Sequence, residues 1–448
     1  MAHHHNNSAY GRLAERLNRF PQGAPAAPLL FGILKMLFSE EEAGLVAQLP
    51  IKPFNAAAAA KAWQRSEADS RKILETLAGR AILLDLEQNS EQIYCLPPPM
   101  AGFFEFAFMR VRNDIDQKAL AELLEQYIHV EEDFMRELFV RGDTGLGRVF
   151  VQESALEEAA RLEILDYERA GHVIDSAKAI GVSLCYCRHK KEHLGANCAA
   201  PMDICMTFNS AAQSLIKHGH ARAVSREECH DLLQQACAAN LVQFGENNRE
   251  GVNFICNCCG CCCEALAAVK RFGIVQTMHS NFIIALDTQK CLGCGKCGKI
   301  CPVGALRVSD ARNASNASGE AGGDGGVSGP ENAGEPDARA KGRKSPPELR
   351  QEICLGCGVC VRACPTACLK LIPRPGRTIT PLNTAHRLVL MAAERGVLQN
   401  LIFDNQILAS HRLAAALLGA ILKLPPVARS LAQKQLKSRY VEKMLGRM

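Results

Sequence analysis

Two stretches decide the fold of the second half of this 448-residue chain: "CLGCGKCGKICP" at residues 291–302 and "CLGCGVCVRACP" at residues 354–365. Both have the spacing C-x2-C-x2-C-x3-C-P. Three thiolates spaced three residues apart on a tight loop reach three irons of one cubane cluster, and the fourth cysteine of such a run binds the neighbouring cluster. The repeated motif therefore predicts two [4Fe–4S] clusters as cofactors, and zinc fits this spacing less well.

The crossed pattern assigns four cysteine ligands to each cluster. The first cluster takes Cys291, Cys294, Cys297 and Cys364, and the second takes Cys354, Cys357, Cys360 and Cys301. Glycines between the ligands let each loop fold closely enough to aim backbone N–H groups at the sulfurs; these are Gly293, Gly295, Gly356 and Gly358. Cys368 has no place among the eight ligands and is predicted to be a buried thiol.

This segment, residues 282–373, resembles the bacterial two-cluster ferredoxin domain, which implies an electron-carrying unit. It departs from that domain in one respect. An insertion rich in Gly, Ala, Ser and Asn, residues 309–349, separates the two motifs and is predicted to be flexible. Because the entropic cost of closing a loop grows slowly with its length, crossed ligation remains feasible.

The bulk composition agrees with a metalloprotein of the cytoplasm. The chain has 22 cysteines, and its start carries no apolar signal segment, so the cysteines are interpreted as thiolate ligands in a reducing compartment rather than as disulfides. A net charge of +5 is too small to indicate nucleic-acid binding by itself. No apolar run reaches the roughly 18–20 residues that a membrane span needs.

A second group of cysteines lies upstream of the ferredoxin motifs. "CYCRHKKEHLGANCAAPMDIC" supplies Cys185, Cys187, Cys198 and Cys205, four cysteines that could close one metal site. The basic run "RHKK" at residues 188–191 follows Cys187 directly and is predicted to stabilise thiolate and a negatively charged cluster. The run "NFICNCCGCCCEA" at residues 253–265 then places six cysteines in eight positions: Cys256, Cys258, Cys259, Cys261, Cys262 and Cys263. Adjacent cysteines cannot all face one cube without strain, so some must point elsewhere.

Several interpretations of this central region stay open. In the first, the earlier quartet binds a third Fe–S cluster, and the later run shields or completes it, with Cys256, Cys258 and Cys259 as possible contributors. In the second, both groups are pooled around a cluster of unusual shape. In the third, the run is a redox-reactive thiol patch; zinc or no metal is the remaining alternative.

The rest of the chain predicts an α+β protein of several domains. Residues 1–28 are predicted to be a disordered tail, and residues 29–100 a winged-helix-like domain of three capped helices and a hairpin. Residues 101–281 are predicted to be a helical cysteine-rich domain, and residues 374–448 C-terminal helices. The third N-terminal helix carries Glu67, Asp69 and Glu75 beside Arg71 and Lys72. It is therefore better suited to docking than to reading DNA.

From about residue 29 onward the chain also resembles a family of multidomain bacterial and archaeal 4Fe–4S proteins. The resemblance rests on the winged-helix-like start, the "CYCR" and "FICNCC" stretches and the two-cluster segment. It implies this architecture rather than a particular reaction.

We therefore expect an iron–sulfur electron carrier, or an oxidoreductase subunit, that relays electrons between a partner protein and the central cysteines. The alternatives are a redox-sensing winged-helix regulator, with DNA as its partner, and an oxidoreductase whose active site is the central region. Cations beside the cluster ligands favour a partner with an acidic surface; they are Lys296, Lys299, Arg362 and Lys370. The sequence predicts no oligomeric state.

Overall fold

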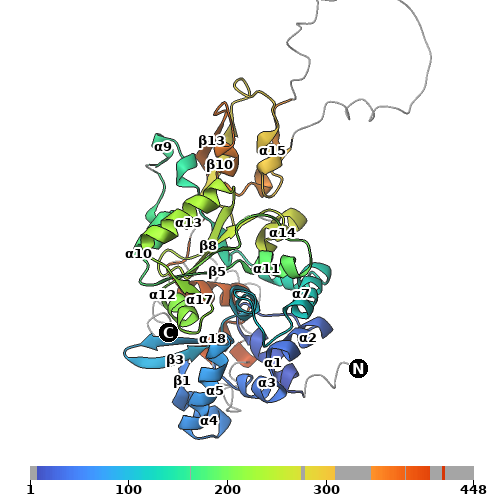
Figure 1. Ribbon diagram of the computed structural model, residues 1–448, viewed down its shortest axis with the longest axis vertical. Helices are drawn as coiled ribbons and strands as arrows, with labels where there is room; N and C mark the ends of the chain where they lie inside the picture. Colours follow the sequence, from blue (N-terminus) through green and yellow to red (C-terminus); the bar gives the residue numbers. More distant parts are fainter. Residues whose placement is uncertain are drawn as a thin grey trace, which may run out of the picture.

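The computed structural model describes residues 8–161, 163–273, 278–307, 345–378, 380–403 and 416–418. Figure 1 shows an elongated molecule in three tiers. N-terminal helices and a hairpin form one end, an antiparallel sheet with helices forms the middle, and the segment with both ferredoxin motifs forms the other end.

The first tier begins earlier than expected. Residues 8–28 are not a disordered tail: α1 (Ala9–Arg19) starts at Ser8, whose side chain accepts a hydrogen bond from the Gly11 N–H, and α2 spans Pro28–Leu37. Leu13 and Leu17 lie one helical turn apart and are buried in the main core. The polar, Pro-rich composition of this region concealed that short apolar stripe.

The predicted helices and hairpin of the N-terminal region are present. They are α3 (Glu40–Val46), α4 (Ala56–Trp63), α5 (Glu67–Gly79), β2 (Leu84–Gln88) and β3 (Glu91–Cys95), with β1 (Phe54–Asn55) completing a sheet of order β1-β3-β2. The capping box of Ser39 and Glu42 is formed, and Asn55 and Ser66 cap α4 and α5. This arrangement agrees with the winged-helix interpretation, which stays a prediction.

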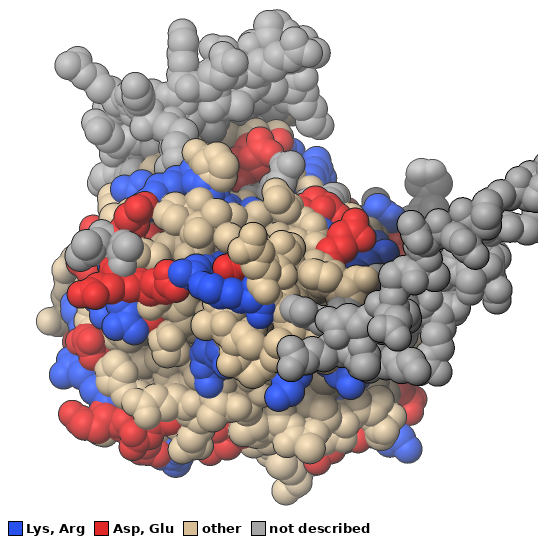
Figure 2. Space-filling view, turned by 90° about the horizontal axis from the view of Figure 1, so that it is seen from above, with Lys and Arg blue, Asp and Glu red and all other residues tan. Residues whose placement is uncertain are grey.

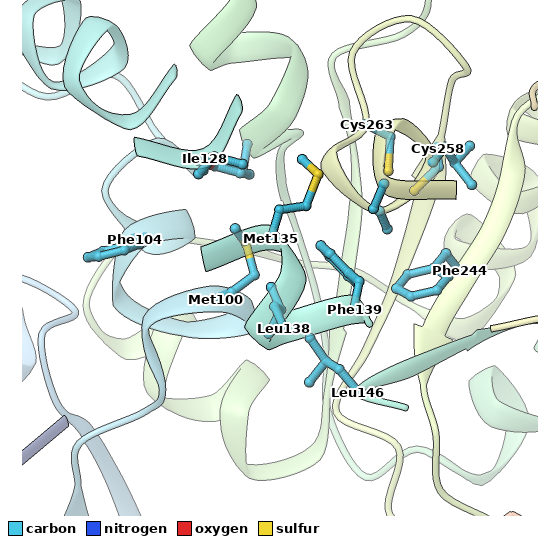
Figure 3. Packing of buried hydrophobic residues seen from close by; sticks show 14 of the residues in the cluster. Met100, Phe104, Ile128, Met135, Leu138, Phe139, Leu146, Phe244, Cys258 and Cys263 are labelled. Carbon is cyan, nitrogen blue, oxygen red and sulfur yellow. The ribbon is translucent and has the colours of Figure 1, made fainter. Parts of the chain in front are cut away.

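A helical layer joins the first tier to the second. It consists of η1 (Pro99–Phe103), α6 (Phe104–Phe106), α7 (Gln117–Glu125), η2 (Gln126–Val130) and α8 (Asp133–Phe139). Figure 3 shows that its apolar side chains continue without a break into the central tier. Met135 and Phe139 lie beside Phe244, Cys258 and Cys263 in one buried cluster, so the central cysteines are part of the main core.

The middle tier is not the helical domain that the sequence predicted. It contains a six-stranded antiparallel sheet of order β4-β8-β9-β6-β5-β7. The strands are β4 (Gly147–Val149), β5 (Ile180–Leu184), β6 (Asp203–Phe208), β7 (Arg222–Ala223), β8 (Val242–Glu246) and β9 (Phe254–Cys258). They have at most six residues, and β5, β6 and β8 are buried almost throughout, so they lack the alternation that marks a half-exposed strand.

Helices lie around this sheet, except for Glu158–Arg161, which lies against Leu369–Pro373 of the third tier. The helices of this part of the chain are η3 (Glu153–Ala155), α9 (Glu158–Arg161), η4 (Asp166–Glu168), α10 (Ala170–Ser176), α11 (Tyr186–His193), α12 (Asn209–Lys217), α13 (Arg226–Ala238) and α14 (Glu264–Phe272). Helices α10 and α13 pack on one another and share an apolar cluster with sheet residues that include Met206 and Ile255.

The third tier has two similar halves. β10 (Phe282–Leu286) pairs antiparallel with β13 (Leu369–Pro373), and β11 (Leu306–Arg307) pairs with β12 (Glu348–Leu349). Each half carries a cysteine loop and a short helix, α15 (Lys296–Ile300) or α16 (Val359–Arg362), with η6 (Gln351–Ile353) ahead of the second loop. The predicted flexible insertion lies, up to residue 344, outside the described residues.

The chain then returns along the molecule as α17 (Thr384–Glu394) and α18 (Leu398–Ile402). Arg387 of α17 is buried and pairs with Glu246 at the end of β8 at 2.6 Å. The C-terminal helices predicted beyond residue 403 lie outside the described residues except for 416–418. Within the described ranges, no helix combines the length and the hydropathy that crossing a bilayer requires.

Candidate iron–sulfur centres

One cysteine of the first ferredoxin motif lies among three cysteines of the second. A cavity of about 330 Å³ is lined by Cys301 together with Cys354, Cys357 and Cys360, and by apolar residues that include Ile284 and Leu355. We call it the inner cavity. Four thiols around one apolar space suit a cubane cluster, and they are the set that crossed ligation assigns to the second cluster.

Two glycines shape the loop of this inner cavity. Gly356 has φ of 64°, and a Cβ there would overlap the carbonyl oxygen of Phe282. Gly358 has φ of 89°, and a Cβ there would lie 2.7 Å from the Cβ of Ala155. A residue with a side chain would be strained at both positions.

The remaining motif cysteines lie further out. Cys291 and Cys297 are buried, whereas Cys294 is exposed. Cys364, assigned to the same cluster, has its Sγ 3.3 Å from the Sγ of Cys368. Cys368 is buried, as predicted, and lies beside Cys364, a predicted ligand of the first cluster.

The inner half of the third tier is fastened to the middle tier. The Gln152 N–H donates to the Cys357 carbonyl at 3.0 Å, and the Ser280 hydroxyl donates to the Gly356 carbonyl at 2.7 Å. Gly260, in the cysteine run, lies against Pro302: a Cβ at Gly260 would lie only 2.9 Å from the Pro302 Cα and would overlap the Pro302 carbonyl oxygen. The central cysteine run thus contacts the residue next to Cys301, a predicted ligand of the second cluster.

Six of the central cysteines surround a second cavity, of about 610 Å³, which we call the central cavity. They are Cys185, Cys187, Cys205, Cys256, Cys258 and Cys263; the adjoining Cys259 also reaches the cavity wall. Two of the six belong to neighbouring strands, since the Sγ atoms of Cys205 on β6 and Cys256 on β9 lie 3.8 Å apart. The structure therefore pools both central stretches around one space.

The sheet explains why these cysteines converge. Met206 of β6 pairs with Ile255 of β9, so the preceding Cys205 and the following Cys256 are direct neighbours on the same face. Cys256 and Cys258 are two residues apart on β9 and share that face. The alternation C-N-C at residues 256–258 was the sequence signal for this arrangement.

The electrostatics of the central cavity favour negative charge. Cys185 is the N-cap of α11 and Cys263 the N-cap of α14, so two helix N-termini are directed at the site. Arg188 is completely buried; burial lowers the pKa of its guanidinium, but the nearby sulfurs of Cys185, Cys259 and Cys258 outweigh burial and raise this pKa. Its Nη1 donates to the Asn257 carbonyl at 3.1 Å, whereas its Nε and Nη2 are buried with no hydrogen-bond partner among the described residues.

The position of Arg188 indicates that the thiols around it carry negative charge when a cluster is bound. A buried guanidinium without a negative partner would raise the free energy of the folded protein. A thiolate-bound iron–sulfur cluster is anionic and fits this donor set. The residues of the central cavity therefore fit an iron–sulfur cluster.

The cations that follow Cys187 have different roles from the one predicted. The sequence suggested that the "RHKK" run as a whole stabilises thiolate. Lys190 is instead buried between Glu125 and Glu264, at 2.6 Å from each, and Lys191 pairs with Glu125 at 2.5 Å. These ion pairs join α7, α11 and α14, so only Arg188 of the run serves the thiols.

One carboxyl group borders the central cavity. Glu105 accepts a hydrogen bond from the Ala101 N–H at 3.0 Å. Burial raises the pKa of Glu105 well above its usual range, and the nearby thiols of Cys256 and Cys263 raise this pKa further. No sequence motif marked this residue, because it becomes part of the site only when the helical layer packs on the sheet.

The predicted quartet of Cys185, Cys187, Cys198 and Cys205 is divided by the structure. Cys198 lies with Cys259, Cys261 and Cys262, and the Sγ atoms of these four are all within 4.8 Å of one another. The other three line the central cavity. All 22 cysteines lie in the described ranges, and none is in a disulfide.

Comparison with known proteins identifies one part of the chain. Residues 290–368 match the family model of the 4Fe-4S dicluster domain. The chain has no match among curated proteins, and it has none among solved structures. The segment with both ferredoxin motifs is therefore a 4Fe–4S dicluster domain, and the chemistry that it supports is iron–sulfur electron transfer.

Proposed function

We propose that this protein relays electrons between a partner protein and the central cavity by way of two clusters in the dicluster domain. Cys291, Cys294, Cys297 and Cys364 would hold the outer cluster, and Cys301, Cys354, Cys357 and Cys360 the inner one. The observation that carries the proposal is the grouping of Cys301 with three cysteines of the other motif around the inner cavity. A cluster of this kind carries one electron.

The outer end has the features of a docking site for a redox partner. Cys294 is exposed, and beside it Leu292 is 53% exposed. Of the four cations predicted to attract an acidic partner, Arg362 bonds to Gln152 and Lys370 pairs with Glu157. Lys296 and Lys299 remain exposed.

The partner contact proposed here is therefore small and local. Figure 2, which views this end of the molecule, shows basic and acidic side chains interspersed rather than one large patch of a single sign. An acidic group on the partner would approach Lys296 and Lys299 directly, and the attraction would weaken with salt.

The part of the dicluster domain that carries Cys301 lies next to the cysteine run of the central cavity. Gly260 contacts Pro302, which follows the inner ligand Cys301, and Gly260 belongs to the loop that ends at Cys263. We propose that Cys185, Cys187, Cys205, Cys256, Cys258 and Cys263 supply the ligands of a third iron–sulfur cluster. The regrouping replaces the predicted quartet, because Cys198 has other partners.

Quantitation of iron and acid-labile sulfide in the anaerobically purified protein, combined with EPR of the reduced protein, tests the proposal. Two cubanes account for about eight sulfides per chain and a third for about twelve. A value near twelve supports the relay. A value near eight would exclude a third cubane, and the relay would then end at the inner cluster. A value near four would refute the presence of two clusters in the dicluster domain.

A second candidate function, an oxidoreductase with its active site at the centre, is favoured by one specific observation. A cavity of about 1,340 Å³, open to solvent and lined mainly by apolar side chains, lies between the β2–β3 hairpin, α12 and α17. It reaches Cys205 and Cys256, and Glu105 lines both this cavity and the central one. We call it the side cavity.

The side cavity has the properties of a small-molecule site, mainly apolar with a few polar groups. One of these groups, Arg387, has a buried Nε with no hydrogen-bond partner among the described residues. A substrate with apolar rings and one carboxylate or carbonyl oxygen would satisfy it. Reduction of such a substrate would consume electrons from the relay and protons from solvent.

Binding of 2-naphthoate, which has this chemistry, separates the two functions. We expect it to alter the EPR spectrum of the reduced protein, and Ala211→Phe, which fills the side cavity, to abolish the change. The exposed Ala57→Phe is the control. An unchanged spectrum in the wild-type protein would leave electron transfer as the only supported role.

The regulator alternative receives less support from the structure. On α5, Arg71 pairs with Glu67 at 2.9 Å, and Arg65 ahead of the helix pairs with Glu41 at 2.7 Å. Cations held by neighbouring carboxylates contribute little to phosphate binding. The acidic residues of α5 thus argue against DNA as a partner.

A further inference from the structure

Four cysteines that the proposed relay does not use lie together beside the central cavity. The Sγ atoms of Cys198, Cys259, Cys261 and Cys262 are all within 4.8 Å of one another, and those of Cys261 and Cys262 are 3.8 Å apart. Cys198 lies in the loop after α11, and the other three lie between β9 and α14. No disulfide joins these elements to one another here.

The spacing of the sulfurs discriminates between a single ion and a cubane. A tetrahedral ion with metal–sulfur bonds of 2.3 Å separates its ligand sulfurs by about 3.8 Å. The four cysteine sulfurs of a cubane bind four different irons and therefore do not all lie so close together. The central cavity has one close pair, Cys205 and Cys256, but no three of its cysteine sulfurs form such a group among the described residues. The four sulfurs of the present quartet, all within 4.8 Å of one another, are compatible with a single ion.

The surroundings also suit a closed structural site. Cys259 and Cys262 are buried against Ile204, Ala236 and Leu241, whereas Cys261 is exposed. An ion can therefore enter from solvent and is then held against an apolar wall. Four thiolates leave no open position, as in structural rather than catalytic sites.

We propose that Cys198, Cys259, Cys261 and Cys262 bind one tetrahedral metal ion, Zn²⁺ or Fe²⁺, that joins the loop after α11 to the cysteine run. Both ions accept four thiolates in this geometry. This site uses none of the cysteines that the proposed relay assigns to its clusters. An ion that binds without sulfide is not part of a cubane, so the proposal goes beyond the relay.

Elemental analysis of zinc and iron together with acid-labile sulfide, on full-length protein purified anaerobically, tests this site. We expect Cys198→Ser and Cys261→Ser each to lose one metal ion per chain while sulfide is unchanged, and the element that is lost identifies the ion. Cys237→Ser, a half-buried cysteine outside both groups, should lose neither. Loss of sulfide together with metal, or no loss of metal, would overturn the proposal.

X-ray absorption at the edge of the identified metal provides a measurement on the wild-type protein that does not depend on variants. If the ion is zinc, we expect about four sulfur neighbours at about 2.3 Å and no metal neighbour. A zinc site with nitrogen or oxygen ligands, or a protein with no zinc and a metal-to-sulfide ratio of one, would refute the site. Because the relay is tested by sulfide content, failure of either proposal leaves the other standing.

Discussion

The Sγ atoms of Cys205 and Cys256 lie 3.8 Å apart although the two residues are 51 positions apart in the chain. Strands β6 and β9 bring them together at the edge of a cavity that five further cysteines also line. This pair joins the "CYCR" region to the "FICNCC" region and defines the centre to which the dicluster domain is proposed to deliver electrons.

Replacement of Cys205 tests the central cluster. We expect Cys205→Ser to lose about a third of the sulfide and to leave about eight sulfides per chain, because only one of three cubanes is affected. Cys229→Ser is the control, since Cys229 is a buried core thiol whose pKa burial raises to about 12. Equal sulfide in both variants would remove Cys205 from the ligand set.

Crossed ligation can be tested at Cys301. We expect Cys301→Ser to eliminate the EPR signal of the inner cluster and to preserve that of the outer one, although Cys301 belongs to the first motif. Cys364→Ser should have the opposite effect. If Cys301→Ser instead damages the cluster of its own motif, ligation is not crossed.

Arg188 is expected to control the potential of the central cluster. Arg188→Gln removes a buried positive charge, which should lower the midpoint potential by tens of millivolts; for one electron, about 59 mV corresponds to a tenfold change in equilibrium constant. Arg188→Lys retains the charge and should restore much of the difference. Potentiometric titration followed by EPR measures the shift, and identical potentials in all three proteins would contradict this role.

The contact of Gly260 with Pro302 should be sensitive to one methyl group. Gly260→Ala places a Cβ against the Pro302 backbone, and we expect it to destabilise the junction by about 1–3 kcal/mol. It should also slow electron transfer from the dicluster domain to the central cavity, measured by stopped-flow reduction. Gly376→Ala, whose Cβ would meet nothing within 4 Å, is the matched control and should behave as wild type.

Asp85 provides a pH-dependent test of the packing between the first and second tiers. Burial raises the pKa of Asp85, but hydrogen bonds from Lys217, Ser214 and His218 on or next to α12 outweigh it, so this pKa lies below its usual value. Because the folded-state pKa is depressed, the stabilisation is present above the unfolded pKa of about 3.9 and is lost as pH falls through the folded value.

We therefore expect Asp85→Asn to lower the free energy of unfolding by about 2 kcal/mol at neutral pH. The difference from wild type should shrink below about pH 4. Urea unfolding across this range measures it, with the exposed Glu87→Gln on the same strand as control. A difference that stays constant down to acid pH would show that the carboxylate charge is not responsible.

Local signals in the sequence identified much of this molecule. The dicluster domain could be predicted from the spacing of its eight motif cysteines, because each motif is contiguous; their roles as ligands stay a prediction. The caps at Ser39, Asn55 and Ser66 and the hairpin turn were predictable for the same reason. The predictions of a disordered tail over residues 8–28 and of a helical middle domain were wrong. The apolar stripe of α1 is short and lies in a polar, Pro-rich region, and fully buried short strands show no alternation.

The sequence by itself therefore determined the iron–sulfur chemistry, because each cysteine motif lies in one contiguous stretch, residues 291–302 or 354–365. Only the tertiary structure decided how the central cysteines are divided, because antiparallel register places Cys205 beside Cys256, whereas the loop after α11 carries Cys198 to Cys259, Cys261 and Cys262. It also placed Arg188 and Glu105 at the central cavity. The neighbours of a buried charge come from distant segments, and no local pattern records them.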